Sequence, residues 1–101
     1  MKKLVVGNWK MNPKTAGEAT LLASAIAKGT KNVWRNVDVV LAPPFPFLPL
    51  IRPTSLRTSN SSLKLGAQDV FWDGKGAYTG EVSPAHLRSL GVRYVLVGHS
   101  E

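Results

Sequence analysis

Four short apolar segments, separated by lengths that suit a crossover helix, constrain the fold of this chain more than any other feature. They cover residues 4–7, 37–42, 63–68 and 93–98 and are rich in Val, Leu and Ala. Their apolar runs do not alternate strictly with polar residues, which is typical of parallel strands covered by helices. The sequence therefore predicts three consecutive βα units followed by a fourth strand.

The first crossover carries the clearest helix signals. Thr15 and Glu18 have the spacing of a capping box, in which the side chain at each end satisfies a free backbone N–H at the other. An Ala- and Leu-rich stretch follows and runs to Lys28, and Gly29 is a residue typical of a helix end. We therefore expect a regular helix that begins after Thr15 and ends at Gly29.

The other two crossovers are less regular. Residues 45–53 contain three prolines, so we expect one or two helical turns there, packed by the two phenylalanines of the segment. Residues 54–62 are predicted to be a polar connection. The third crossover begins with a long loop, residues 69–81, and continues with a serine cap, a first-turn proline and a glycine stop within residues 83–91.

Consecutive βα units build either a doubly wound open sheet or part of a (β/α)8 barrel, and a complete barrel needs about 250 residues. With 101 residues, the chain has the length of about half a barrel. No Gly-x-Gly-x-x-Gly pattern follows the first predicted strand, which weighs against a dinucleotide-binding sheet. In both architectures ligands bind at the carboxyl ends of the strands. The polar side chains expected at those ends are Asn8, Lys10, Gln68, His99 and Glu101.

Two of these strand ends carry residues suited to chemistry. Lys10 and Asn8 could offer a fixed charge and an orienting donor to an anionic ligand, although taken alone they fit a solvated loop lysine beside a turn-forming asparagine better. His99 precedes residues that resemble a helix start, whose positive dipole end disfavours imidazolium. A neutral ring there could polarise a carbonyl, and the alternative is a histidine hydrogen-bonded within the core.

Composition and charge weigh against several other functions. The net charge of +7 comes from thirteen basic residues scattered from Lys2 to Arg93, so we expect no nucleic-acid binding. The excess fits a segment of a larger, more balanced protein, or attraction of a small anionic substrate. The chain has no cysteine, which rules out a disulfide scaffold and a thiolate metal site. No apolar run approaches the roughly 20 residues of a membrane span and no signal peptide is evident, so we expect a cytoplasmic location and no membrane contact.

Four motifs together resemble the triosephosphate isomerase family. They stand in the family's order and at its separations, and they span essentially the whole chain, but they cover only the family's amino-terminal half. The resemblance implies that residues 1–101 form a single incomplete (βα)3β unit, the first half of a (β/α)8 barrel. The motifs are Gly7-Asn8-Trp9-Lys10-Met11-Asn12, Gly66-Ala67-Gln68-Asp69, Gly76-Ala77-Tyr78-Thr79-Gly80-Glu81-Val82-Ser83 and Val97-Gly98-His99-Ser100-Glu101.

The resemblance also implies an activity. The family interconverts dihydroxyacetone phosphate and glyceraldehyde 3-phosphate through an enediolate, without a cofactor, in glycolysis and gluconeogenesis. By resemblance, Asn8 orients the substrate and Lys10 supplies a cation near its phosphate and developing oxyanion. His99 is the neutral electrophile that bridges the two substrate oxygens. Glu101 matches a supporting carboxylate beside the lysine, with an ordinary first-turn helix glutamate as the alternative.

The long loop resembles the segment that the family inserts into a neighbouring subunit. The resemblance implies a homo-oligomer in which Thr79 reaches toward the partner's lysine and asparagine. The alternative is a glycine-rich surface loop whose glycines only ease its turns. The residues predicted at the subunit interface are Gln68, Tyr78, Thr79, Gly80 and Glu81.

The family's proton-abstracting glutamate, its closing lid and its phosphate loops belong to the second half, which the motifs do not cover. General-base transfer contributes about a hundred- to ten-thousandfold to rate, so we expect the chain to be inactive or very weak alone. It would then need a complementary carboxyl-terminal half. The alternative is a half-barrel that assembles with itself through its exposed strand edges, as a structural or phosphate-binding module without catalysis.

Overall fold

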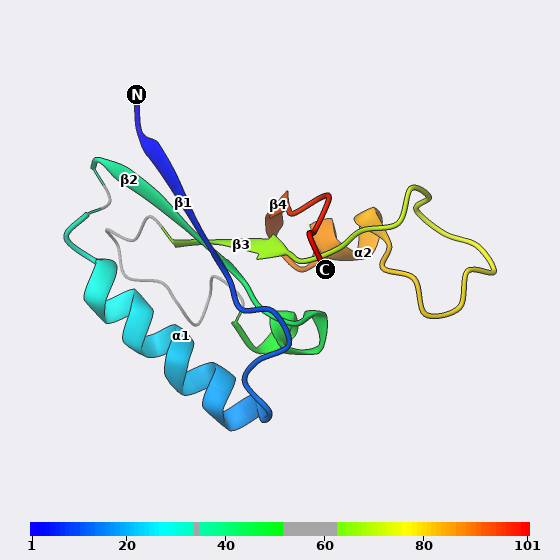
Figure 1. The fold of residues 1–101 in the computed structure, drawn as a ribbon, viewed down its shortest axis with the longest axis horizontal. Helices are drawn as coiled ribbons and strands as arrows, with labels where there is room; N and C mark the ends of the chain where they lie inside the picture. Colours follow the sequence, from blue (N-terminus) through cyan, green and yellow to red (C-terminus); the bar gives the residue numbers. More distant parts are fainter. Residues whose placement is uncertain (34, 52–62) are drawn as a thin grey trace.

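The computed structural model describes residues 1–33, 35–51 and 63–101, so the predicted polar connection at 54–62 lies outside the described residues. Strands and helices alternate along the chain, as the spacing of the apolar segments predicts (Figure 1). The elements are β1 (Lys3–Asn8), α1 (Ala16–Thr30), β2 (Val37–Ala42), the 3-10 helix η1 (Phe45–Ile51), β3 (Leu63–Ala67), α2 (Pro84–Ser89) and β4 (Val92–Val95).

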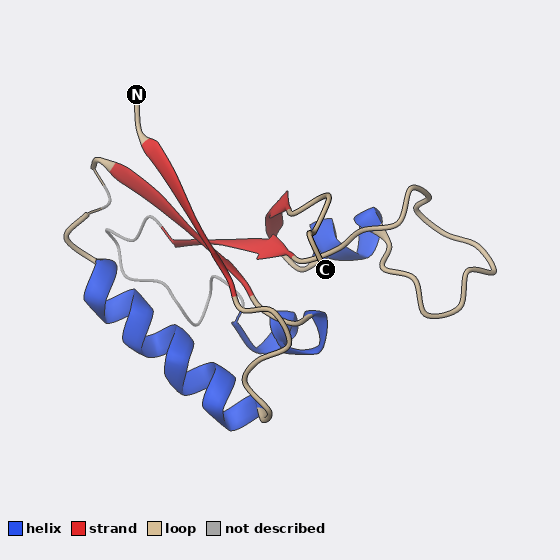
Figure 2. Ribbon diagram, viewed as in Figure 1, coloured by secondary structure: helices blue, strands red, loops and turns tan. Residues whose placement is uncertain are grey.

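The four strands form one parallel sheet in chain order, β1-β2-β3-β4 (Figure 2). β1 and β2 pair along their whole length, so that Asn8 aligns with Ala42 at the carboxyl end. The pairing of β3 with β4 is also parallel, with a register shift between Leu65 and Gly66. This arrangement confirms the predicted α/β class and is that of the first half of a (β/α)8 barrel. Because all four strands are parallel, their carboxyl ends lie at the same end of the sheet.

The fourth strand is shorter than predicted. It ends at Val95, although the apolar run predicted a strand to Gly98. The backbone N–H of Leu96 still donates to the Ala67 carbonyl over 2.9 Å. Gly98 then adopts a left-handed conformation, with φ at +78°, that a strand does not accommodate. The residues after β4 therefore leave the line of the sheet before His99.

The start of α1 is as predicted, and its end is not. The Thr15 hydroxyl accepts the Glu18 backbone N–H over 3.2 Å, which is one half of the capping box. Gly29 lies inside the last turn rather than beyond it, and the helix ends at Thr30, whose hydroxyl donates to the Ile26 carbonyl. Small residues four positions apart let this helix pack closely against the rest of the chain. The buried face consists of Ala19, Ala23 and Ala27.

The second crossover is the short 3-10 helix η1, in keeping with its prolines, but only one of its two phenylalanines packs against the core as predicted. Leu48 and Ile51 are the buried residues of η1. Phe45 is 60% exposed, and Phe47 is only partly buried against the core. In a 3-10 helix residues three apart lie on the same side, so Leu48 and Ile51 share the face that meets the core.

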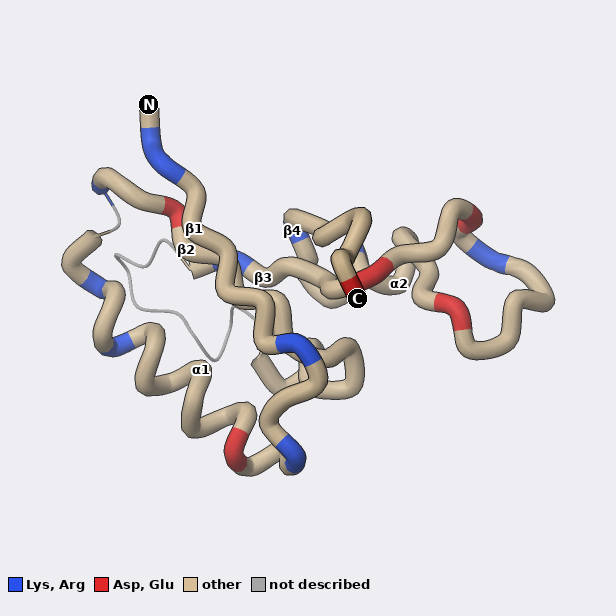
Figure 3. Tube along the Cα trace, viewed as in Figure 1, with Lys and Arg blue, Asp and Glu red and all other residues tan. Residues whose placement is uncertain are grey.

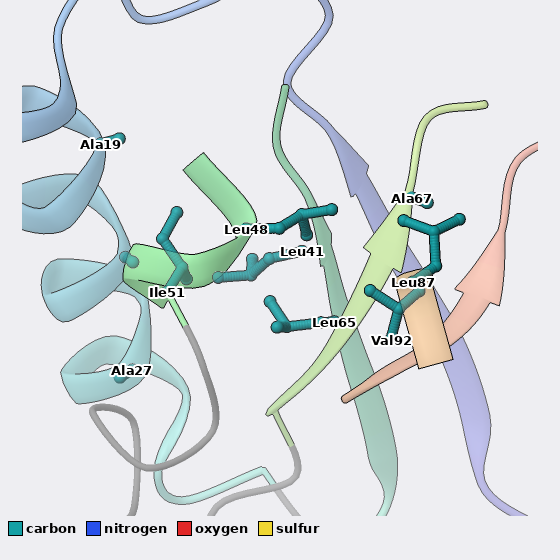
Figure 4. Packing of buried hydrophobic residues seen from close by; sticks show 10 residues of the cluster. Ala19, Ala27, Leu41, Leu48, Ile51, Leu65, Ala67, Leu87 and Val92 are labelled. Carbon is teal, nitrogen blue, oxygen red and sulfur yellow. The ribbon is translucent and has the colours of Figure 1, made fainter. Parts of the chain in front are cut away.

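A single apolar cluster supports the strand ends. Figure 4 shows the alanines of α1, the two buried residues of η1, Leu41 of β2 and Leu65 of β3 facing a common space. Leu87 of α2 and Val92 of β4 extend this cluster toward the last strand. The backbone of Ala67 at the end of β3 is thereby held by packing, and this fixes the point at which the next residue leaves the sheet.

The third crossover has the predicted cap and stop. The Ser83 hydroxyl accepts the backbone N–H groups of Ala85 and His86, and it donates to the Gly74 carbonyl. Gly91 adopts the left-handed conformation expected just after a helix. The preceding loop extends away from the sheet as an arm (Figure 2). Across the described residues, none of the helices is both long and apolar enough to cross a membrane.

Candidate functional site

An open cleft of about 760 Å³ lies at the carboxyl ends of the strands. It gathers side chains from the end of β1 and from the residues that follow β1, β3 and β4. All five polar residues expected at the strand ends line it, together with three that sequence reasoning did not select. The lining residues are Asn8, Lys10, Met11, Asn12, Gln68, Asp69, His99 and Glu101.

The turn after β1 holds Lys10 in an unusual backbone conformation. Its φ is +56°, in the left-handed region that residues with a side chain seldom adopt. The Lys10 backbone N–H donates to the Asn8 side-chain oxygen over 2.9 Å. The Gln68 side-chain amide donates to the Lys10 carbonyl over 2.7 Å. Both peptide groups of Lys10 are therefore tied to side chains of the cleft.

Lys10 and Glu101 form an ion pair that joins the ends of the first and last strands. The Lys10 Nζ lies 2.6 Å from a Glu101 carboxylate oxygen, and the Ser100 hydroxyl donates to the other oxygen over 2.9 Å. The hydrogen bond from Lys10, a backbone hydrogen bond and the one from Ser100 lower the pKa of Glu101 to about 2. Glu101 is therefore an anion at neutral pH, and a carboxylate with so low a pKa is a poor general base.

His99 is positioned by the residue that follows β3. Its Nε2 is hydrogen-bonded to the Gln68 backbone carbonyl. A carbonyl oxygen only accepts, so Nε2 must carry the proton in this arrangement. The ring therefore carries an N–H donor at Nε2, which the Gln68 carbonyl accepts in the structure. A neutral imidazole of this tautomer can donate to a carbonyl or enolate oxygen.

The other predicted interface residues lie on the long loop and do not line the cleft. The Tyr78 ring packs on Phe71 and Trp72, at centroid distances of 4.6 and 5.7 Å. Thr79 and Gly80 are exposed. Gln68 differs from this group, because its side chain bonds Lys10 and Ala42 within the chain. The interface role of these residues stays a prediction.

Sequence reasoning did not select Met11, Asn12 or Asp69 as cleft residues, although each neighbours a predicted one. The sequence did carry a signal for them, because Met11 and Asn12 belong to the first family motif and Asp69 belongs to the second. Figure 3 shows the basic residues spread along the described chain, and Lys10 is the one lysine or arginine among the residues that line the cleft. Within residues 1–33, 35–51 and 63–101, no group of three or more His, Asp or Glu side chains is arranged to hold a metal ion.

Comparison with known proteins agrees with the fold. The family model described as Triosephosphate isomerase matches residues 3–101. A triosephosphate isomerase of Acidithiobacillus ferrooxidans is 46% identical over 97% of this chain and 36% of its own length. A triosephosphate isomerase of Paracidovorax citrulli is 46% identical over 99% of this chain and 39% of its own length. One from Moorella thermoacetica is 45% identical over 99% of this chain and 38% of its own length. The chain thus spans little more than a third of the length of these relatives.

Proposed function

Because the chain belongs to the triosephosphate isomerase family, we propose that its cleft is the electrophilic part of a site that interconverts dihydroxyacetone phosphate and glyceraldehyde 3-phosphate. The main support is the convergence of Asn8, Lys10 and His99 on one cleft at the carboxyl ends of the strands. The reaction moves a proton between two adjacent carbons and needs positive charge and hydrogen-bond donors at the two oxygens.

Lys10 supplies the positive charge in this proposal. The substrate is a phosphate ester whose carbonyl oxygen gains negative charge as the enediolate forms. A cation held in place before the reaction stabilises that developing charge without reorganisation. The backbone ties of Lys10 to Asn8 and Gln68 support such preorganisation. Asn8 would orient the substrate from the same turn.

His99 acts as the electrophile. Its Nε2 proton, which the Gln68 carbonyl accepts in the structure, would be donated to the substrate carbonyl oxygen. As the carbon-bound proton leaves, electron density moves onto this oxygen, and the hydrogen bond from His99 strengthens. The ring can then pass a proton between the two oxygens of the enediolate while the carbon proton is returned to the neighbouring carbon.

The base that removes the carbon proton is the missing part of this site. Glu101 is held by Lys10 with a pKa lowered to about 2, which makes it a supporting anion. We propose that the base, the lid and most of the phosphate-binding site come from residues beyond these 101, in the part of the relatives that the chain does not span. The chain alone is then inactive or very weak. The cytoplasmic location and the glycolytic role expected from the sequence are parts of this proposal.

Isomerisation of glyceraldehyde 3-phosphate tests the assignment directly. The purified chain is assayed alone and after mixing with the carboxyl-terminal part of the Acidithiobacillus ferrooxidans relative. The two histidines of the chain provide a matched pair of variants. His99→Ala removes the proposed electrophile, and His86→Ala changes a residue that lies in a different cavity at the base of the long loop.

We expect little or no activity from the chain alone, and activity in the mixture that His99→Ala abolishes and His86→Ala retains. Lys10→Ala is expected to abolish it as well. Activity of the mixture that survives His99→Ala, in preparations in which the carboxyl-terminal part alone shows none, would contradict the site. Robust activity of the chain alone, lost in His99→Ala, would contradict the part of the proposal that assigns the base to other residues.

A second candidate function is a self-assembling half-barrel without catalysis. It is favoured by the exposure of apolar side chains on the two outer strands, where Leu4 and Val5 are 49% and 54% exposed and Val95 is 37% exposed. Pairing of these edges in two copies would supply eight strands. This candidate predicts one discrete oligomer, in which His99→Ala changes neither the mass nor any activity.

A further inference from the structure

We propose that Gln68 is a positioning residue of the site, which holds in place the turn that carries Lys10. This inference rests on the proposed function for its catalytic consequence and on the structure alone for its geometry. Gln68 follows directly after β3, whose last residue, Ala67, is only 1% exposed. Its backbone therefore starts from a point fixed by the core.

The side chain of Gln68 uses its amide nitrogen twice. Nε2 donates to the Lys10 carbonyl over 2.7 Å and to the Ala42 carbonyl over 2.9 Å. Ala42 is the last residue of β2, and Lys10 lies two residues beyond β1. A side-chain amide has two N–H groups, and both partners here are oxygens that only accept. The side chain thus ties the end of β1 to the end of β2.

The bond to Lys10 supports a conformation that the lysine would not adopt by itself. A left-handed residue with a Cβ is disfavoured by its own carbonyl, so the turn needs contacts that outweigh this preference. The Asn8 side chain holds the N–H of Lys10, and the Gln68 side chain holds its carbonyl. Without the second contact, the peptide after Lys10 is free to rotate, and the direction of the ammonium changes with it.

The backbone of Gln68 contacts the segment that follows β4. Its carbonyl accepts the Nε2 proton of His99. This is the proton that His99 donates to the substrate in the proposed function, so the main-chain contact must break when substrate binds. The positioning role therefore rests on the side chain of Gln68, which acts on Lys10. The distance between Lys10 and His99 decides whether one substrate can meet both of them.

The bonding pattern requires a residue with two donors at position 68. Methionine has a similar length and no donor. Glutamate has the same length, but its carboxylate only accepts and would face two carbonyl oxygens. We therefore expect Gln68→Met to release the Lys10 turn, and Gln68→Glu to repel it at neutral pH. Thr30→Val is the matched control, because it removes a side-chain bond to a carbonyl on α1, away from the cleft.

The geometry is tested by NMR on the chain itself. Gln68 is the only glutamine in the sequence, so its side-chain amide signals can be assigned without ambiguity. We expect two amide protons protected from exchange with water, and a strong intraresidue NOE between the amide and α protons of Lys10, which reports a positive φ. The NOE should weaken in Gln68→Met and persist in Thr30→Val.

The catalytic consequence is tested in the mixture with the carboxyl-terminal part of the relative. Misplacement of a reacting group by about 1 Å costs up to about a hundredfold in rate, so we expect kcat to fall about 10- to 100-fold in Gln68→Met and to stay near the unsubstituted value in Thr30→Val. The Glu101 carboxylate should also titrate at higher pH in Gln68→Met than in Thr30→Val, because its ion pair depends on the position of Lys10.

Each result has one meaning. Rapid exchange of both Gln68 amide protons in the unsubstituted chain overturns the proposal, and this measurement needs no variant to fold. An unchanged Lys10 NOE in a folded Gln68→Met also overturns it. If the NMR signatures are as expected but the unsubstituted mixture shows no isomerase activity, the positioning role stands and the proposed function fails.

Discussion

At the scale of single residues, the cleft depends on a few side chains that fix backbone rather than on many contacts. Lys10 adopts a positive φ because Asn8 and Gln68 hold its two peptide groups. Glu101, which follows the outer strand on the opposite side of the sheet, pairs with the Lys10 ammonium. Both members of this pair are more than half exposed, so the pair contributes more to the orientation of the lysine than to stability.

The acid titration of Glu101 is a first prediction. Because its pKa in the folded chain is lowered from 4.5 to about 2, the stabilisation from the ion pair is complete above about pH 5 and is lost as the pH falls toward 2. The side-chain carboxyl carbon of Glu101, followed by NMR, should show a midpoint near 2. In Lys10→Met the midpoint should move up toward 4.5. An unchanged low midpoint in that variant would mean that Lys10 is not the cause.

At the scale of elements, glycines have opposite roles in β3 and α1. A Cβ on Gly66 of β3 would lie 2.8 Å from Val40 Cγ1 and 3.5 Å from the Tyr94 carbonyl, so this position requires glycine for space. Val40 is fully buried, so any shift of its side chain disturbs the packing around it. Gly29 in the last turn of α1 meets no atom within 4 Å. Only the first of these glycines is needed for packing.

Gly66→Ala is therefore expected to destabilise the chain. Overpacking of a buried sheet position costs about 1–3 kcal/mol of unfolding free energy. Urea denaturation followed by circular dichroism measures this change. In a Val40→Ala background, where the clashing methyl is absent, the same substitution should cost less. Equal costs in the two backgrounds would rule out the contact with Val40 as the reason.

Gly29→Ala is expected to stabilise the chain, in contrast to Gly66→Ala. Alanine loses less backbone entropy than glycine in a helix, and the site is open, so the unfolding free energy should rise by about 0.5–1 kcal/mol. The same denaturation experiment measures it, with Gly66→Ala as the contrasting variant. A loss of stability would indicate that Gly29 ends the helix in solution, as its sequence position alone predicts.

At the scale of the whole molecule, the most prominent feature is that each of the two outer strands has one edge without a partner strand among the described elements. Among the described elements, β1 pairs only with β2, and β4 pairs only with β3. Their outer edges present backbone groups and apolar side chains, with Val5 54% exposed and Val97, just beyond β4, 84% exposed. Open edges of this kind promote association with another chain. Among the described residues, the buried cluster has ten members.

Association through the edges is the prediction at this scale. In sedimentation velocity the chain should run as species heavier than its 10.9 kDa monomer. Val5→Lys puts a charge on the edge strand and should shift the distribution toward monomer. Leu21→Lys is the matched control, because Leu21 is 74% exposed on α1. Equal effects of the two variants would show that the added charge, and not the edge, controls association.

Local patterns predicted much of the fold and most of the cleft. The cap at Thr15 and the stop at Gly91 were predicted because each depends on residues a few positions apart. The predictions for Phe45 and Gly29 failed because exposure of a phenylalanine and continuation of a helix depend on what packs against them. Asp69 was missed as a cleft residue because nothing in its own segment shows which way its side chain faces.

The sequence by itself determined the order of the elements and the placement of Asn8, Lys10 and His99 near strand ends, because apolar runs, caps and stops act over a few residues. Only the tertiary structure decided which of these groups meet. Lys10 and Glu101 are 91 positions apart, and β1 and β4 are the two outer strands of the sheet. The two side chains contact each other because the segments after both parallel strands leave the sheet at the same end. Sheet order and register are set by packing of the whole chain, so no local pattern contains them.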